Sequence, residues 1–241
     1  SSPAFPIPQA TSQAVIVLGF DTATPATAVA ITGTDNDTEL RHEPADGERP
    51  GHVSQLLPLI EQAIEQADTT WDQIERIAVD VGPGTFTGLR IGIATAHGLA
   101  HARGLPLAGV SSLEALAAEA AHDEHEGPVL AVLDARRGEA FAAAWTAGGA
   151  PLLEPAALGP EALAEQVKSL HPGTLAVGDG AVRFRGVLEA AGVAVPDDDS
   201  ALHRVRARQV CLLGGRGSAG DPAQVLPLYL RAPDASPRRS P

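Results

Sequence analysis

The sequence is poor in residue types on which several kinds of chemistry depend. Its 241 residues include no methionine, one cysteine (Cys211) and one lysine (Lys168). A single cysteine excludes an internal disulfide and a cysteine-based zinc site, which fits a reducing, cytoplasmic setting. Cys211 stands in an apolar stretch, so we expect a buried structural thiol rather than a nucleophile. Lys168 does not follow a glycine loop, so the P-loop pattern is absent.

Positive charge and long apolar runs are also scarce. The 17 basic residues are outnumbered by 30 acidic ones, which gives a formal net charge of −13. Direct binding of nucleic acid as the main activity is therefore disfavoured, because phosphate contacts need clustered basic residues. No apolar run reaches the roughly 18 residues that a membrane span requires. The 44% hydrophobic content is enough for an ordinary core in one large or two small domains.

Strands, hairpins and helices recur in two passes, each of which opens with a buried strand that ends in Asp. This pattern predicts two similar α/β halves, 14–110 and 111–225, with 226–231 returning to the first half and loose tails at 1–13 and 232–241. Apolar runs and alternation predict strands at 14–20, 26–31, 37–42, 74–81, 107–110, 129–133, 139–145 and 174–177. Helical spacing predicts helices at 52–67, 87–103, 111–121, 160–170, 181–191 and 203–214.

The glycine-rich turn Gly82-Pro83-Gly84-Thr85-Phe86-Thr87-Gly88 lies between a buried strand and a helix. Glycines allow backbone angles that other residues avoid, and the N–H groups at a helix start can hold an anion. Asp21 and Asp80 also lie at or near strand ends, where cleft ligands are often bound. Asp21, Thr22, Gly82, Gly84 and Thr85 are therefore candidate nucleotide-binding residues. A tight connection without any ligand explains the turn equally well.

The helix after this turn carries small residues every four positions, at Gly88, Gly92, Ala96 and Ala100. That spacing aligns them on one face, where another backbone can approach closely. Each glycine inside a helix costs about 1 kcal/mol relative to alanine, so close packing must compensate. The stripe predicts either packing within the same domain or a helix–helix interface with another chain.

Other motifs favour structural roles. His97 and His101 share a helix face, but no third metal ligand is evident. Ser111 and Ser112 are better explained as helix caps than as nucleophiles, because the strained serine elbow motif is absent. The turn Asp134-Ala135-Arg136-Arg137-Gly138 is either a solvated hairpin tip or a charged contact for a partner's phosphate or carboxylate.

Taken in order, several segments resemble the bacterial TsaB (YeaZ-type) family. They are the Asp21-Thr22 strand end, the helix with Leu56-Leu57-Pro58, and the segments 82–100, 104–117 and 133–141. Weaker likeness continues in 178–181 and 227–231, and residues 197–241 match poorly. The resemblance implies an actin/Hsp70-like (ASKHA) fold with mixed sheets. It also implies a role in making threonylcarbamoyladenosine at position 37 of tRNAs that read codons beginning with A.

The same resemblance implies partners and a division of labour. Members of the family pair with the catalytic paralogue TsaD, and the ATPase TsaE joins them. TsaD carries a His-x-x-x-His metal motif, whereas the matching positions here are Ser112 and Leu116. The resemblance thus predicts a non-catalytic scaffold without a metal or a firm cofactor. ATP or ADP could bind within the complex, tRNA would be contacted only indirectly, and the isolated chain could form a homodimer.

We expect the partner interface on the helices 52–67 and 87–103. The candidate contact residues are His52, Leu56, Leu57, Ile60, Gly88, Arg90, Gly92, Ala96 and Ala100. Two other classes of function remain as alternatives. One is an ASKHA-type ATPase or phosphotransferase that uses Asp21, the Gly82–Thr85 turn and Gly178-Asp179-Gly180. The other is a metallopeptidase, which the missing histidine pair disfavours.

Overall fold

Two mixed β-sheets organise the chain. The computed structural model describes residues 15–45, 47–122, 125–170, 172–216 and 221–231, and the expected tails at 1–13 and 232–241 lie outside them. The first sheet has the strand order β3-β2-β1-β4-β5 and the second the order β8-β7-β6-β9. In each sheet an antiparallel hairpin meets strands that pair in parallel, so the expected mixed sheets are present.

The strands of the first sheet are β1 (Val17–Asp21), β2 (Thr27–Thr32), β3 (Thr38–His42), β4 (Arg76–Gly82) and β5 (Leu107–Ser111). Those of the second are β6 (Val129–Arg136), β7 (Glu139–Trp145), β8 (Pro151–Leu158) and β9 (Leu175–Val177). The α-helices are α1 (His52–Gln66), α2 (Phe86–Arg103), α3 (Ser112–His122), α4 (Pro160–Lys168), α5 (Asp179–Arg183), α6 (Arg185–Ala190) and α7 (Ala207–Arg216). Two short 3₁₀ helices are η1 (Ala201–His203) and η2 (Pro222–Gln224).

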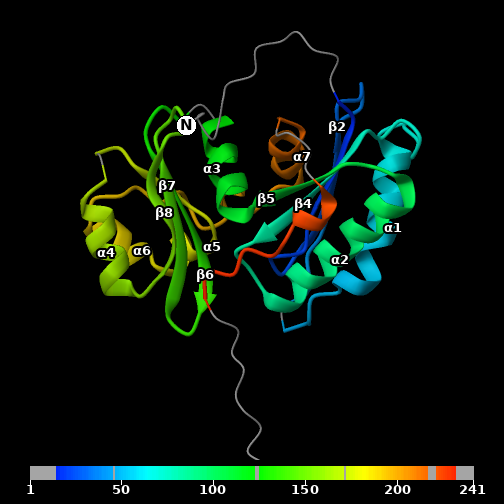
Figure 1. Cartoon of the computed structure of the whole chain (residues 1–241). Helices are drawn as coiled ribbons and strands as arrows, with labels where there is room; N and C mark the ends of the chain where they lie inside the picture. Colours follow the sequence, from blue (N-terminus) through cyan, green and yellow to red (C-terminus); the bar gives the residue numbers. More distant parts are fainter. Residues whose placement is uncertain (1–14, 46, 123–124, 171, 217–220, 232–241) are drawn as a thin grey trace, which may run out of the picture.

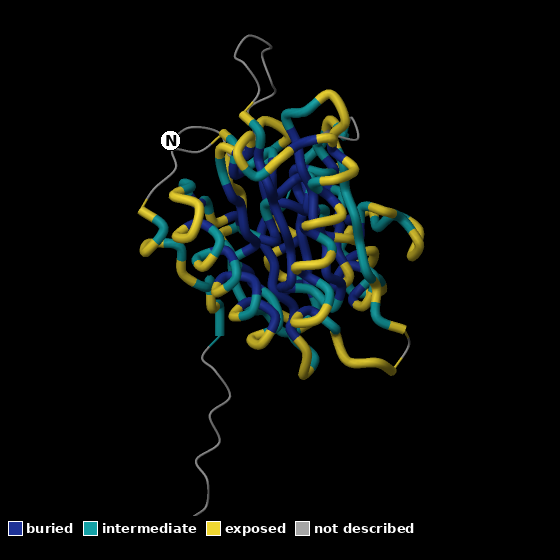
Figure 2. Tube along the Cα trace, turned by 90° about the vertical axis from the view of Figure 1, so that its right-hand side faces the viewer, coloured by how far each residue is buried: buried dark blue, intermediate teal, exposed yellow. Residues whose placement is uncertain are grey.

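Helices and sheets alternate in layers across the molecule (Figure 1). Helices α1 and α2 cover the outer face of the first sheet, α7 and α3 lie between the two sheets, and α4 and α6 cover the outer face of the second. Side chains alternate along β1, so Leu18 and Phe20 join the core under α1 and α2 while Val17 joins the central core. The buried residues accordingly follow the strands through the middle of the molecule (Figure 2).

Helix α7 packs on the first sheet although it follows the second sheet in sequence. A side chain at Gly19 of β1 would meet the Sγ of Cys211 at 2.5 Å, and one at Gly214 would meet the Cβ of Ala78 at 2.5 Å. Cys211 is fully buried in this contact, as predicted for a structural thiol, and burial raises the pKa of its thiol. The range 111–225, which we expected to form the second half, therefore includes a helix that belongs to the core of the first.

Some element boundaries differ from the sequence-based predictions. The helix expected at 203–214 is instead η1 followed by α7, and the one expected at 181–191 is divided into α5 and α6. Pro58 neither delays nor ends α1, which begins at His52. The segment 225–231 is extended but forms no strand, and Leu228 N–H donates to the carbonyl of Val81 at 2.7 Å. No helix among the described ranges is long and apolar enough to cross a membrane.

The small-residue stripe of α2 faces the core of its own domain, which corrects the expectation that it forms a partner interface. A Cβ at Gly88 would lie 1.8 Å from the carbonyl oxygen of Thr22, and one at Gly92 would lie 2.4 Å from the Thr22 Oγ1. Ala96 and Ala100 are buried in the core shared with α1. The close approach of the helix backbone to the β1–β2 turn thus explains why glycine occupies these positions.

This packing predicts opposite effects for two glycine substitutions in one helix. Gly88→Ala should destabilise the fold by about 3 kcal/mol or more, because its methyl group would overlap a backbone carbonyl that cannot move away. Gly98→Ala, with no atom within 4 Å of the new Cβ, should stabilise the fold by about 0.5–1 kcal/mol. Urea unfolding followed by circular dichroism measures both. Equal stability of the two variants would contradict the inward orientation of the stripe.

Candidate functional site

The first acid of the site, Asp21, ends β1 and is fully buried. Its Oδ1 accepts hydrogen bonds from the backbone N–H of Ala23 at 2.6 Å and of Thr24 at 3.4 Å. Its Oδ2 accepts one from the hydroxyl of Thr24 at 2.6 Å. The carboxyl group therefore fixes the turn between β1 and β2. Thr22, also buried, donates its hydroxyl to the carbonyl of Gly88 at 2.8 Å, which ties this turn to α2.

The second acid, Asp80, lies on the neighbouring parallel strand β4 and is only 1% exposed. Its Oδ1 accepts from Gly82 N–H at 2.7 Å and from the hydroxyl of Ser112 at 2.6 Å. Burial, together with the nearby Asp21 carboxylate, raises the pKa of Asp80 well above its ordinary value, and burial also raises the pKa of Asp21. The raised pKa favours the neutral form of Asp80, and the two acids link the ends of β1 and β4 to the start of α3.

This arrangement leaves little room for a metal-bound phosphate near the acid pair. Asp21 and Thr22 are sealed from solvent and engaged with the backbone, and Gly82 is buried. A Cβ at Gly84 would lie 2.5 Å from the carbonyl oxygen of Ala23. The prediction that Asp21, Thr22 and Gly82 contact a nucleotide directly is therefore corrected. Gly84 and Thr85 do line a pocket, on the outer side of the turn.

That pocket, of about 590 Å³, lies where the two sheets meet. We call it the junction pocket. Three turns of the chain, the end of β6 and the extended segment 228–231 surround it. Its lining consists of Ala23, Thr24, Pro25, Pro83, Gly84, Thr85, Phe86, Leu133, Asp134, Ala135, Arg136, Arg137, Phe141, Asp179, Leu228, Tyr229, Leu230 and Arg231. Sequence reasoning missed it because no single motif contains it, although its 134–138 turn was identified as a charged tip.

Charged side chains from the second sheet, from α5 and from the segment 228–231 lie along one wall of the junction pocket. Asp134 pairs with Arg136 at 3.2 Å and with Arg183 at 3.0 Å, while Glu139 pairs with Arg231 at 2.8 Å. Asp179 opens toward the pocket, accepts the N–H of Asp134 at 3.0 Å, and has a raised pKa because surrounding protein atoms displace water. Arg136 and Arg137 both have positive φ angles, 64° and 54°, which cost energy outside glycine.

Aromatic side chains form the opposite lip. The rings of Phe86 and Tyr229 lie 5.6 Å apart and are tilted by 32°. The two residues are 40% and 41% exposed, so each ring is partly open to solvent. The guanidinium carbon of Arg90 lies 3.8 Å from the centre of the Phe86 ring, a cation–π contact. An aromatic pair that carries one arginine, in a pocket lined by Arg136, Arg137 and Arg231, is suited to an anion that carries a flat group.

Some of the remaining predicted site residues are buried and others are exposed. His52, Leu56 and Ile60 lie on the buried side of α1, so they stabilise the core and are not a contact surface of this chain. The Nδ1 of His52 lies 2.8 Å from the hydroxyl of Thr27, and burial lowers the pKa of the imidazole. Leu57 and Arg90 are exposed. The described part of the chain contains no cluster of three potential metal ligands, and the Nε2 of His97 lies 3.0 Å from the Val225 carbonyl oxygen.

Comparison with known proteins gives consistent matches. The family model described as "TsaD: tRNA N6-adenosine threonylcarbamoyltransferase" matches residues 46–179. The tRNA threonylcarbamoyladenosine biosynthesis protein TsaB of Escherichia coli is 30% identical, over 89% of this chain and 94% of that protein. An uncharacterized protein of Mycobacterium tuberculosis is 33% identical, over 92% of this chain and 94% of its own.

A solved structure agrees with these matches. YeaZ from Pseudomonas aeruginosa superimposes with a TM-score of 0.74 at 26% identity, and the alignment covers 88% of this chain and 100% of that one. With its two mixed α/β halves, the fold is of the actin/Hsp70-like type, as the sequence predicted.

The acid pair predicts a specific dependence of stability on pH. Because the folded pKa of Asp80 is raised, the folded protein binds more protons than the unfolded chain above about pH 4, so its free energy of unfolding falls as pH rises. Asp80→Asn keeps an oxygen for Gly82 and Ser112 but cannot ionise. We expect it to stabilise the protein at about pH 8, with a gain that disappears toward about pH 4.

The matched control is Glu61→Gln, which removes one negative charge from the exposed face of α1. Urea unfolding at several pH values measures both variants. A gain for Asp80→Asn that is the same at all pH values, or is matched by Glu61→Gln, would contradict the raised pKa of Asp80 in the folded protein.

Proposed function

Because this chain belongs to the TsaB family, whose members act in threonylcarbamoyladenosine synthesis in tRNA, we propose that it is a non-catalytic subunit that binds TsaD. In this role it supports threonylcarbamoyl transfer to adenosine 37 of tRNAs that read codons beginning with A, and TsaE joins the complex. The observation that carries the proposal is the identity of the two residues at the positions of the metal-binding histidines of TsaD. Where TsaD has two metal-binding histidines, Ser112 donates to Asp80 and Leu116 is fully buried.

The outward face of α1 and α2 supports a binding role. Val53 is 79% exposed and Leu57 is 52% exposed on successive turns of α1. Ala94 and Gly98 are exposed on the neighbouring α2, and an added Cβ at Gly98 would meet nothing within 4 Å. We call Val53, Leu57, Ala94 and Gly98 the α1–α2 face. Apolar side chains that stand out beside small residues allow a partner helix to pack closely.

This face differs from the stripe that the sequence suggested, although it lies on the same two helices. The buried residues Gly88, Gly92, Ala96 and Ala100 hold α2 against the sheet, while the α1–α2 face points away from it. In the absence of TsaD, the same face could pair with a second copy of the chain. Any ATP or ADP would then be bound in the assembled complex rather than at the sealed Asp21 and Asp80.

A charge placed on the α1–α2 face should prevent complex formation without affecting the fold. Leu57→Glu should weaken binding to TsaD by about tenfold or more, because a carboxylate would be buried against apolar atoms. Its free energy of unfolding should change by no more than about 0.5 kcal/mol, since the side chain is exposed. Co-purification and calorimetry with TsaD, with and without TsaE and ATP, measure the effect.

Leu152→Glu is the matched control, because Leu152 is a similarly exposed leucine, at 39%, on β8 of the second sheet. Normal binding by Leu57→Glu, or equal loss in both variants, would remove the α1–α2 face from the proposal. Failure of the unmodified chain to bind TsaD at all would refute the proposed function.

A further inference from the structure

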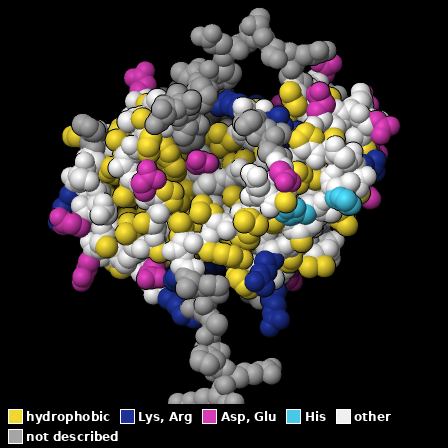
Figure 3. Space-filling model, viewed as in Figure 1, with side chains coloured by type: hydrophobic (Ala, Val, Ile, Leu, Met, Phe, Trp, Pro, Cys, Tyr) yellow, Lys and Arg dark blue, Asp and Glu magenta, His cyan; other side chains and the backbone are white. Residues whose placement is uncertain are grey.

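Basic residues in this acidic protein are concentrated around the junction pocket. Arg136, Arg137 and Arg231 line it, and Arg90 and Arg183 contact the lining residues Phe86 and Asp134. Two carboxylates, Asp134 and Asp179, also line the pocket, and Glu139 pairs with Arg231. The whole chain shows the reverse ratio, with 30 acidic and 17 basic residues. Figure 3 shows Lys and Arg side chains at the lower edge of the molecule as well as at its upper, left and right edges. Local charge therefore favours an anion here despite the net charge of −13.

The pocket also offers surfaces for a flat, partly apolar group. Phe86 and Tyr229 present exposed rings at the rim, and Phe141, Leu133 and Pro83 lie further along the lining. A volume of about 590 Å³ is within the range of pockets that enclose a small organic ligand. The open carboxyl group of Asp179 can accept a hydrogen bond from an amino group on such a ligand.

The positions of the arginines suggest how a phosphate would approach. Arg90 lies over one face of the Phe86 ring, and no described carboxylate pairs with it. Arg136 and Arg183 both pair with Asp134, and Asp179 lies near Arg136. With Arg137 and the Glu139-paired Arg231, arginines still outnumber carboxylates on the opposite wall. A phosphate that follows a stacked base would thus lie between cations from α2 and from the second sheet. Asp21 and Asp80 are buried and do not line the pocket.

We propose that the junction pocket and its arginine–aromatic rim bind an unstacked nucleotide of a single-stranded RNA segment. Aromatic stacking with basic contacts along the backbone is the general mode by which proteins bind single strands. This assignment replaces the expectation that RNA is contacted only indirectly. The identity of the RNA, an unpaired tRNA loop, rests on the proposed function. The chemistry of binding rests on the residues that line the pocket.

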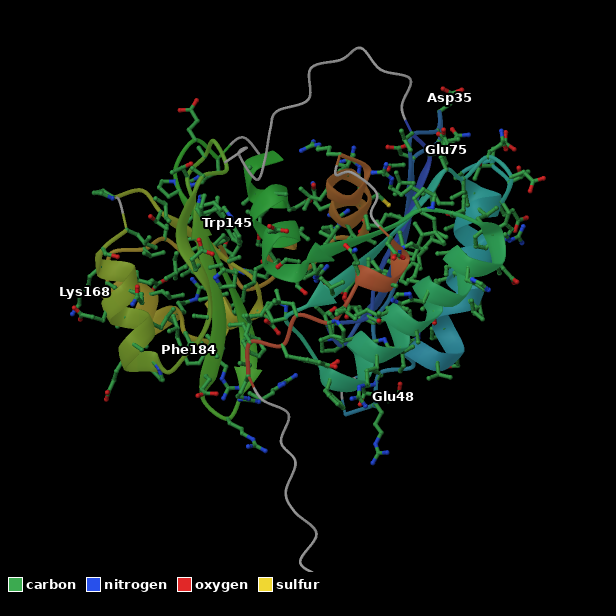
Figure 4. All side chains as sticks on the ribbon, viewed as in Figure 1. Asp35, Glu48, Glu75, Trp145, Lys168 and Phe184 are labelled. Carbon is green, nitrogen blue, oxygen red and sulfur yellow. The ribbon has the colours of Figure 1, made fainter. Side chains whose placement is uncertain are left out.

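The sequence provides a direct reporter for this site. Tyr229 is the only tyrosine, so 3-fluorotyrosine places a single fluorine signal at the rim. A short oligoadenylate added to the full-length chain at low salt should shift this signal in a saturable manner. The two tryptophans, Trp71 and Trp145, serve as internal controls when labelled with fluorine. Trp145 pairs with Val129 at the far end of the second sheet from the β6–β7 turn, and its signal should not move (Figure 4).

Two substitutions test the contacts. Arg90→Gln should reduce RNA affinity about three- to tenfold and lower the slope of log affinity against log salt by about 0.7, the value for one phosphate contact to a single strand. Phe86→Ala should reduce affinity by about fivefold or more through loss of stacking. Lys168→Gln removes the same charge as Arg90→Gln from α4, on the outer side of the second sheet, and should leave affinity and slope unchanged (Figure 4).

Each alternative ligand gives a distinct result. Adenosine 5′-monophosphate that binds as tightly as the oligoadenylate would overturn the RNA assignment in favour of a free nucleotide. Polyglutamate that shifts the Tyr229 signal equally would show an anion site without base recognition, and no saturable shift with RNA would refute the proposal entirely. Binding to TsaD is measured separately on the α1–α2 face, so failure here leaves the proposed function standing.

Discussion

The approach of α2 to the β1–β2 turn is the constraint on which the site depends. Glycine at position 88 lets the helix backbone reach the Thr22 carbonyl, and the Thr22 hydroxyl completes the contact by donating to the carbonyl of Gly88. The contact brings the β1–β2 turn beside the β4–α2 turn, so that Ala23, Thr24, Gly84 and Thr85 form one side of the junction pocket. Any residue with a side chain at position 88 would separate the two turns. The pocket is thus a consequence of helix packing on the first sheet.

Two buried carboxyl groups fix the neighbouring turns and the start of α3, and their burial costs some stability. Asp21 fixes one turn, and Asp80 fixes the next turn and the start of α3 through Ser112. Burial raises the pKa of both carboxyl groups, and the charge of Asp21 raises that of Asp80 further, so ionising both at once costs stability. Apolar residues would be more stable here, but they could not hold two turns and a helix start at once. We infer that the pair positions backbone rather than a ligand.

Much of the fold could be predicted from the sequence, because apolar runs and helical spacing are patterns within short segments. The apolar runs of β1 and β4 and the helical spacing of α1 and α2 match the observed elements closely. Strand β8 escaped prediction because it lies at a sheet edge, carries Pro151 and Pro155, and exposes much of its surface. The direction of the α2 stripe could not be decided either, because spacing reveals that residues share a face but not what that face meets.

The site was less accessible to sequence reasoning because it is built from distant segments. Phe86 and Tyr229 are separated by more than half of the chain, and their contact exists only because 225–231 returns to the first sheet beside β4. Net charge was also a poor guide, since it averages an acidic surface with an arginine-rich pocket rim. Binding depends on the charges within about one Debye length, roughly 8–10 Å, rather than on the sum over the molecule. A net charge of −13 therefore does not exclude the proposed RNA nucleotide at this pocket.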